Sequence, residues 1–445
     1  MNMSASFPLP PAYLLRQTLN DELHARPPVA LNPHERIFYL ALTGTQHSQA
    51  AEQAAIADLF RQLGVNYDIP NAPNLEFDLC GTPDAQACLR GRLRIKVERH
   101  SEFTSWWFFE QVSANTDFEH TPLDLFPAAW LSSLSGETLV AMHIGLHTSA
   151  QPVSVAEVAP HFSGNTLVGG EIADGKAQAF TDFKLGDNGI TRLYVHNRQM
   201  GARQAGRIVQ RLVEIETYRM MALLALPMTR DILPELNACE AETVTLSHQI
   251  AEQPTPELDN PERDKRLQEH ISGLSSRIEA LSARGRSRFS AAEAYYDLVQ
   301  RRISELHEIS RIGIQGFGEF MERRLSPAIR TCLTTARRVE DLTQRVSRLG
   351  QLLQTRVEIE REEQNSRLLA SMDKRARQQL RLQQTVEGLS VVAISYYSLG
   401  VLGYVFKGLH NILHFEVEVA IGASVPLVVA LVAYHLHKLH HRLKD

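Results

Sequence analysis

The chain has 445 residues, a formal net charge of -5 and a mean hydropathy of -0.20. This length allows two or three domains with separate cores, and the charged residues form no clustered basic face of the kind that binds nucleic acid. Four cysteines are present without a Cys-x-x-Cys pair. We therefore expect reduced thiols and predict neither a metal site nor a cofactor.

Residues 1–34 form a proline-rich N-terminal segment that lacks the basic region and long apolar run of a secretory signal. Ionisable side chains gather in LNDELHARPP (19–28), directly before a double proline that ends any helix. His24 and Arg26 are therefore candidates for a polar ligand-binding site. The alternative is that they attach this segment to the next domain.

Residues 35–252 are predicted to form an α+β domain. Short β-rich runs are separated by turn signals such as Asp187-Asn188-Gly189, which is typical of hairpin connections. The runs are RIFYLALT from 36, RLRIKVER from 92, FTSWWFFE from 103, TLVAMHIGLH from 138, AQAFTDFKL from 177 and ITRLYVHN from 190.

Helices are expected at two places in this domain. An amphipathic pattern over residues 48–63 predicts one helix between the strands. The sequence is helical again from 202 to about 252, where Pro227 is expected to kink or end a turn. The apolar residues around Met220 are too few to cross a bilayer, so we assign them to the core against the sheet.

A charged connection between two predicted strands is the second candidate ligand-binding site. It contains Glu98, Arg99, His100 and Glu102, and Trp106-Trp107 follows it. Loops held by a rigid sheet often carry binding sites. The alternative is a solvated turn with one tryptophan facing the core.

Residues 253–387 are predicted to form a helical coiled-coil stalk. Apolar residues recur at spacings of three and four, as in a heptad seam. The seam residues are Leu267, Ile271, Leu274, Ile278, Leu281, Val339, Leu342, Val346 and Leu349. If the chain turns near Gly285, the seam pairs two helices of one chain; if the helix continues, the seam is free for another subunit.

The sequence contains none of the motifs GxxxxGK[ST], HExxH and GxSxG, so we predict no catalytic residue. The cluster Gly313, Gly316 and Gly318 has no preceding strand, which favours a flexible or closely packed point in the stalk over a phosphate loop.

Residues 388–436 are predicted to form a transmembrane hairpin, followed by a basic tail over 437–445. Gly388–Phe406 and Val419–Tyr434 contain no charged side chain and approach the ~20 residues that a bilayer requires. The alternative is a pair of buried core helices. Basic residues lie outside both stretches, so both chain ends are expected in the cytoplasm.

Histidines at the end of the second stretch are a weak metal-site candidate. His437 and His441 share one helical face, but two ligands make no site, so an interfacial anchor is favoured.

Four segments resemble a bacterial family of uncharacterised membrane-anchored proteins classed as a domain of unknown function. They are LNDELHARP, ERHSEFTSW, EIETYRMMALLALP and ISYYSLGVLGYVFKGL, in this order. The resemblance implies a bacterial inner-membrane protein with no assigned reaction, and it assigns no catalytic residue.

In layout alone, the chain is similar to CorA-type magnesium channels, which combine a cytoplasmic α/β domain, a helical stalk and two C-terminal spans. Their Gly-Met-Asn signature is expected where this chain has Gly403-Tyr404-Val405-Phe406. The departure removes the residues that coordinate the hydrated ion.

We predict a non-enzymatic membrane-anchored protein. Its stalk is expected to form a homo-oligomer, and its cytoplasmic domain to bind a protein or small molecule. The alternatives are a CorA-like divalent-cation channel or transporter, and an enzyme that combines His24 and Arg26 with residues 98–102.

Overall fold

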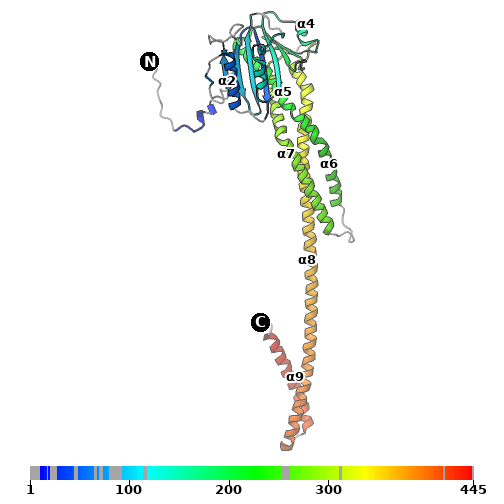
Figure 1. Cartoon of the computed structure of the whole chain (residues 1–445). Coiled ribbons are helices and arrows are strands. Elements are labelled where there is room, and N and C mark those ends of the chain that lie inside the picture. Colours follow the sequence, from blue (N-terminus) through cyan, green and yellow to red (C-terminus); the bar gives the residue numbers. More distant parts are fainter. Residues whose placement is uncertain are drawn as a thin grey trace. The chain divides into compact units, whose positions relative to one another are not determined.

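The computed structural model describes residues 11–17, 19–20, 28–44, 49–64, 68–69, 74–79, 93–113, 118–251, 261–309, 313–413 and 416–442. The chain divides into two compact units (Figure 1). The first, here called the sheet unit, comprises Met1–Gln253 and Glu269–Ser347. The second, the helical unit, comprises Pro254–Gln268 and Arg348–Asp445.

A single eight-stranded sheet is the centre of the described part of the sheet unit. Its strand order is β2-β3-β4-β1-β5-β8-β7-β6, and every neighbouring pair is antiparallel except β5 and β8. The strands are β1 (Glu35–Thr43), β2 (Asn74–Asp78), β3 (Leu93–Arg99), β4 (Phe103–Gln111), β5 (Glu137–Thr148), β6 (Val168–Ile172), β7 (Ala177–Thr181) and β8 (Thr191–Asn197).

The sheet has an apolar core on each face because aromatic residues fill both sides of the central strands. Trp106 and Phe108 of β4 pack in one core with Trp130, under α2 (Gln49–Leu63), η3 (Pro122–Leu125) and α3 (Ala128–Ser133). Trp107 and Phe109 point to the opposite core. This alternation follows from the two-residue period of a strand.

Helix α5 (Ala202–Leu223) covers the other face of the sheet. It contributes apolar side chains such as Ile208 and Leu212 to the core. The N-terminal chain crosses α5 at Gly206, where an added Cβ would lie 1.8 Å from the carbonyl oxygen of Val29. Only glycine permits this approach, which fixes residues 28–31 beside the sheet.

Most predicted elements are present with nearly the expected bounds, and two strands were not predicted. Strands β2 and β6 are short, and Gly169 and Gly170 interrupt the β signal of β6. The short helices α4 (Val155–Val158) and η4 (Ala159–Phe162) precede it. The helical region after β8 breaks at Leu224 rather than at Pro227, which lies in the first turn of α6 (Ala225–Ala251), where proline is tolerated.

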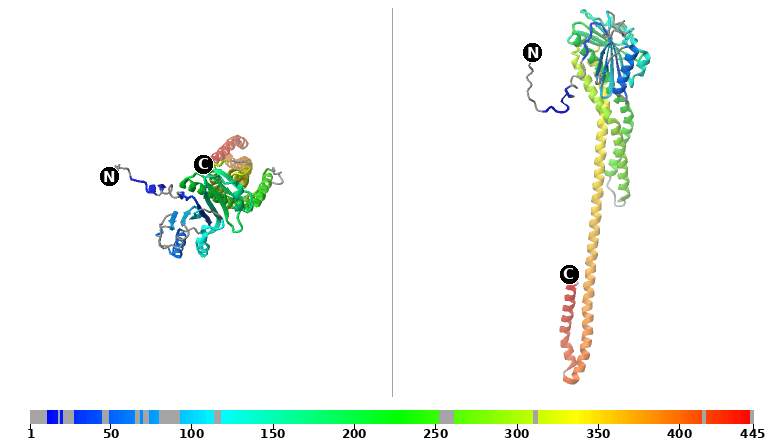
Figure 2. Two further views of the ribbon diagram at one scale, coloured as in Figure 1. Left: turned by 90° about the horizontal axis from the view of Figure 1, so that it is seen from above. Right: turned by 60° about the vertical axis from the view of Figure 1, so that its left-hand side comes forward.

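Three long helices form a bundle in the sheet unit: α6, residues 269–305 of α7 (Pro261–Glu305) and residues 317–347 of α8 (Phe317–Leu413) (Figures 1 and 2). Ion pairs link α6 to both neighbours. Arg277 of α7 lies 2.7 Å from Glu242, and Arg338 of α8 lies 2.7 Å from Glu240.

The predicted seam residues are buried within the single chain. Leu274, Ile278 and Val346 are each 1 % exposed. All other residues of the predicted seam are also buried, except Leu349, which is half-buried. Of the two alternatives at Gly285, the structure has the continuous helix, because α7 runs through this position. A Cβ at Gly285 would lie 3.2 Å from Ile232 of α6. The seam is therefore filled by the chain itself.

The glycine cluster before α8 is a helix cap. Oε1 and Oε2 of Glu308 accept hydrogen bonds from the backbone N–H groups of Phe317 (2.7 Å) and Gly318 (3.1 Å). A Cβ at Gly316 would meet this carboxylate at 2.4 Å. Glu308 thus occupies the position that a bound phosphate would need, and the structure favours the packed-point interpretation.

The helical unit ends with two apolar helices, the last part of α8 and α9 (Val417–Arg442). They run side by side in opposite directions (Figure 2), and Gly403 leaves room for Ile421 of α9. Each contains an 18-residue window that is long and apolar enough to span a membrane and is 6 % buried. A pair of buried core helices would be mostly covered, so that interpretation does not fit these exposures.

Candidate functional site

A cavity of about 320 Å³ lies between the sheet and α5, and we call it the sheet cavity. From the sheet, Tyr39, Glu98, His100, Phe103, Ser105 and Trp107 line it. From the helices, Gln210, Val213, Glu214, Thr217, Tyr218 and Arg302 line it. Its volume lies at the lower end of the range of about 300–1,000 Å³ that is typical of small-molecule pockets.

The sheet side of the cavity contains a buried ion pair. Charged residues alternate with apolar ones along β3, so that Lys96 and Glu98 point toward α5 while Ile95 and Val97 point to the opposite core. The Lys96 ammonium lies 2.9 Å from Glu98 Oε1, and the indole N–H of Trp107 donates to Glu98 Oε2 at 3.2 Å. The Glu98 carboxylate is thereby held in one orientation at the cavity wall.

The helix side of the cavity is one polar strip of α5. Gln210, Glu214, Thr217 and Tyr218 are spaced i, i+4, i+7 and i+8, which places them on one helical face. The hydroxyl groups of Thr217 and Tyr39 are 3.0 Å apart, which ties the helix to β1. Burial raises the pKa of the Tyr39 phenol, so this group stays protonated.

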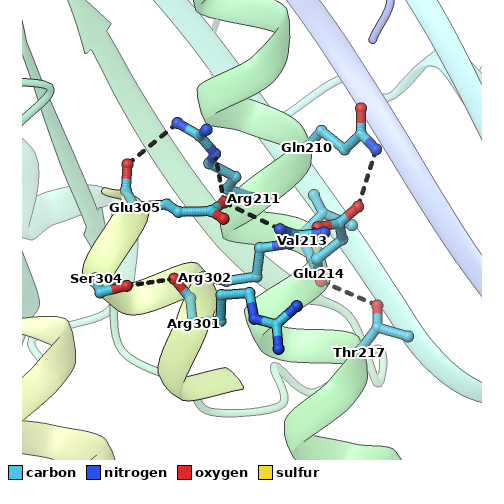
Figure 3. Close-up of polar contacts among 9 residues, drawn as sticks. All are labelled: Gln210, Arg211, Val213, Glu214, Thr217, Arg301, Arg302, Ser304 and Glu305. Carbon is cyan, nitrogen blue, oxygen red and sulfur yellow. Dashed lines mark hydrogen bonds and ion pairs between the residues drawn. The ribbon is translucent and has the colours of Figure 1, made fainter. Parts of the chain in front are cut away.

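Glu214 is the acid at the centre of this strip. It forms an ion pair with Arg302 of α7, and the amide of Gln210 donates to it at 2.8 Å. Arg302 also contacts Glu305 at 3.0 Å, and Glu305 pairs with Arg211 at 3.0 Å (Figure 3). The network joins α5 to the end of α7.

Burial raises the pKa of the Glu214 carboxyl, and the Arg302 guanidinium offsets part of that rise. The charge of Glu98 adds to it. The two carboxylates therefore repel each other across the same space.

The four charged residues predicted to form one site between the strands do not all lie together in the structure. Glu98 and His100 line the sheet cavity, and the His100 ring stacks on Phe103 with centroids 4.1 Å apart. Arg99 points to the opposite face, where its Nε donates to Glu52 of α2 at 3.0 Å. Glu102 pairs with Arg288 of α7 at 3.1 Å, outside the cavity lining.

His24 and Arg26 lie outside the described residues. The enzyme alternative, which needs both, therefore stays a prediction.

Sequence reasoning missed most of the helix side of the cavity. The spacing of Gln210, Glu214 and Thr217 within an otherwise apolar helix face was a readable signal. Arg302 had no local signal, because it lies among exposed charges in RRISEL and reaches the cavity only through the packing of α7.

Two larger hollows, of about 680 and 620 Å³, lie between α7 and α8. Their charged lining residues, such as Glu279 and Arg337, are exposed, so these hollows lack the buried acids of the sheet cavity.

Histidine side chains also gather at one end of the central strands β1, β5 and β8. The rings of His34 and His147 are 4.9 Å apart, and those of His147 and His196 are 6.0 Å apart. Among the described residues, no group of three or more His, Cys, Asp or Glu side chains is arranged to hold a metal ion. The side chains of His437 and His441 lie outside the described set.

The comparison with family models gives a match over residues 11–443, to the family described as "Protein of unknown function (DUF3422)". No curated protein matches the chain. Because the match covers nearly the whole sequence, the chain belongs to this family of proteins of unknown function.

Proposed function

We propose that this protein is a membrane-anchored, non-enzymatic ligand-binding protein. In this proposal the sheet unit binds a small molecule in the sheet cavity, and the apolar stretches of α8 and α9 hold the chain in a bilayer. The observation that carries the ligand-binding part is the convergence of Glu98, Glu214 and aromatic rings on one cavity. A pocket that contains an acid with a raised pKa, here Glu214, is the default hypothesis for a binding site.

Surface exposure supports the membrane anchor. Large apolar side chains of these stretches face outward, including Leu389, Val401 and Leu427, which are 71 %, 65 % and 67 % exposed. Exposing so many leucine and valine side chains to water is unfavourable. On insertion scales, transfer of each such residue into lipid is favourable by about 0.3–0.6 kcal/mol.

Positive charges support an orientation with both chain ends in the cytoplasm. Lys374 and Arg381 precede the first stretch, and Lys438 and Arg442 lie at the end of the second. The connection contains Lys407 against two glutamates. By the positive-inside rule, the two helices form a hairpin with both chain ends in the cytoplasm. The inner membrane of a bacterium is proposed as its location because the family resemblance implies it.

We also propose that the protein forms homo-oligomers, but that the subunits do not contact each other through the predicted seam. Its residues are already buried in one chain, so a second subunit would have to use other surfaces. The mass of the protein in mild detergent tests this point.

Cell fractionation tests the anchor. We expect the full chain to stay in the membrane pellet after an alkaline carbonate wash and to leave it only with detergent. Release of the intact chain by carbonate would refute the anchor.

A thermal-shift screen of the purified full chain against a metabolite library tests the binding role. We expect at least one compound to raise the Tm of the wild type and of Ser105→Ala, but not of Ser105→Leu, whose side chain fills the sheet cavity. If no compound stabilises the wild type, or if Ser105→Leu responds equally, the binding role fails.

A further inference from the structure

Apart from its tyrosines, the sheet cavity has four ionisable lining residues, Glu98, Glu214, Arg302 and His100, and the ring of His100 is stacked on Phe103. Two carboxylates, Glu98 and Glu214, line it against one guanidinium, Arg302. Arg302 is divided between Glu214 and Glu305, and the ammonium group that pairs with Glu98 belongs to Lys96, which is not a lining residue. A ligand in the cavity therefore meets carboxylate oxygens more readily than free positive charge.

Aromatic rings form much of the remaining wall. Tyr39, Phe103, Trp107 and Tyr218 all line the cavity. Tyr39 and Trp107 pack edge to face with centroids 4.6 Å apart, so their orientations are fixed by each other. The faces of such rings attract a cation within about 6 Å of the centroid, and the attraction grows when the site is shielded from water.

We propose that the sheet cavity binds a small organic cation whose ammonium group lies between Glu98 and Glu214 and against the aromatic wall. This inference rests on the proposed function, and it names the chemical class of the ligand. An anion would be repelled by both carboxylates, and its single counter-charge, Arg302, is already engaged by two acids. A neutral ligand would gain no charge–charge attraction from the two carboxylates.

The test compares molecules of one shape and different charge. Choline and its uncharged isostere 3,3-dimethylbutan-1-ol are titrated by calorimetry into the full chain in detergent, together with 1,4-diaminobutane and succinate. We expect choline or 1,4-diaminobutane to bind at least about tenfold more tightly than the isostere, and succinate not to bind.

Variants locate the cation. Glu214→Gln should weaken binding by about tenfold, whereas Glu216→Gln, the same change on α5 outside the cavity lining, should change it by less than about twofold. Tyr218→Leu should weaken binding, and Tyr218→Phe, which keeps the ring face, should restore it. Unchanged Tm values identify variants that remain folded.

The results of these experiments test the cation inference separately from the proposed small-molecule binding role. If the library screen gives cavity-dependent ligands that are neutral or anionic, the cation inference is wrong and the binding role stands. Equal binding of choline and its isostere, or no binding of any panel cation, also overturns the inference.

Repeating the titration in nanodiscs distinguishes a free cation from a lipid headgroup. Weaker choline binding in phosphatidylcholine than in phosphatidylglycerol nanodiscs would identify the headgroup as the source, and equal binding would identify a free cation. Either result supports the ammonium class.

Discussion

At the scale of single residues, Lys96 and Glu98 are both buried, with side chains 5 % and 4 % exposed. Removing both charges from water costs several kcal/mol per ion, and their attraction at 2.9 Å offsets this only while both are present. A strand that alternates charged and apolar residues normally faces water on one side. Here α5 covers that side, and the pair makes the covering possible.

Glu98→Ala is therefore expected to lower the free energy of unfolding by about 3–5 kcal/mol, because the Lys96 ammonium would stay buried without this carboxylate. Denaturant unfolding of the sheet unit, followed by tryptophan fluorescence in the full chain, measures the loss. The double variant Lys96→Met with Glu98→Leu should recover part of it. A loss below about 1 kcal/mol, as for exposed ion pairs, would contradict the burial of this pair.

The cluster of His34, His147 and His196 predicts that the stability of the protein depends on pH. Burial lowers the pKa of His147, and the neighbouring rings of His34 and His196 lower it further. Near pH 6 the folded state therefore binds fewer protons at this ring than the unfolded state, whose imidazole has its ordinary pKa of about 6.5. The contribution of His147 to stability is present above that value and is lost as the pH falls below it.

We expect the Tm of the full chain to fall between pH 7.5 and 5.5, and His147→Gln to reduce the slope of this fall. His248→Gln, which changes an exposed histidine on α6, is the matched control and should leave the slope unchanged. Identical slopes for wild type and His147→Gln would remove this explanation.

At the scale of elements, the bundle of α6, α7 and α8 is stabilised by buried apolar residues at heptad spacing. Ile278 of α7 is 1 % exposed, whereas Val244 of α6 is 55 % exposed. Ile278→Ala should cost about 2–5 kcal/mol of unfolding free energy, and Val244→Ala should stay within about 0.5 kcal/mol. Equilibrium unfolding measures both. Similar small effects at the two positions would mean that the bundle is not packed as described.

Local patterns were sufficient to predict most elements, because the strands and the bundle helices carry strong periodicity. These local patterns could not predict which surfaces of the helices and strands pack against each other. The heptad of α7 is equally compatible with a second subunit, and only the presence of α6 beside Gly285 decides between the two. The same holds for the site, since Glu98 and His100 were predicted and Arg302 reaches them from about 200 residues away through tertiary packing.

At the scale of the whole molecule, large apolar side chains are buried in one part of the chain and exposed in another. The sheet unit buries most of its large apolar side chains in apolar cores, while the end of the helical unit exposes them. Leu352 and Leu427 are exposed to similar extents, 60 % and 67 %, yet only Leu427 lies in an apolar stretch. A charge introduced at Leu427 should therefore impair membrane insertion, whereas a charge introduced at Leu352 should not.

Leu427→Arg places a charge at the centre of the second proposed span, which costs about 3–4 kcal/mol of insertion free energy relative to leucine. We expect α9 to remain outside the bilayer, so that the first span alone crosses it and the C-terminus moves to the opposite side. A C-terminal fusion to a reporter that fluoresces only in the cytoplasm should be bright in the wild type and in Leu352→Arg, and dark in Leu427→Arg. A dark wild-type fusion would contradict the hairpin with both chain ends in the cytoplasm, because two crossings return the chain end to the side from which it started.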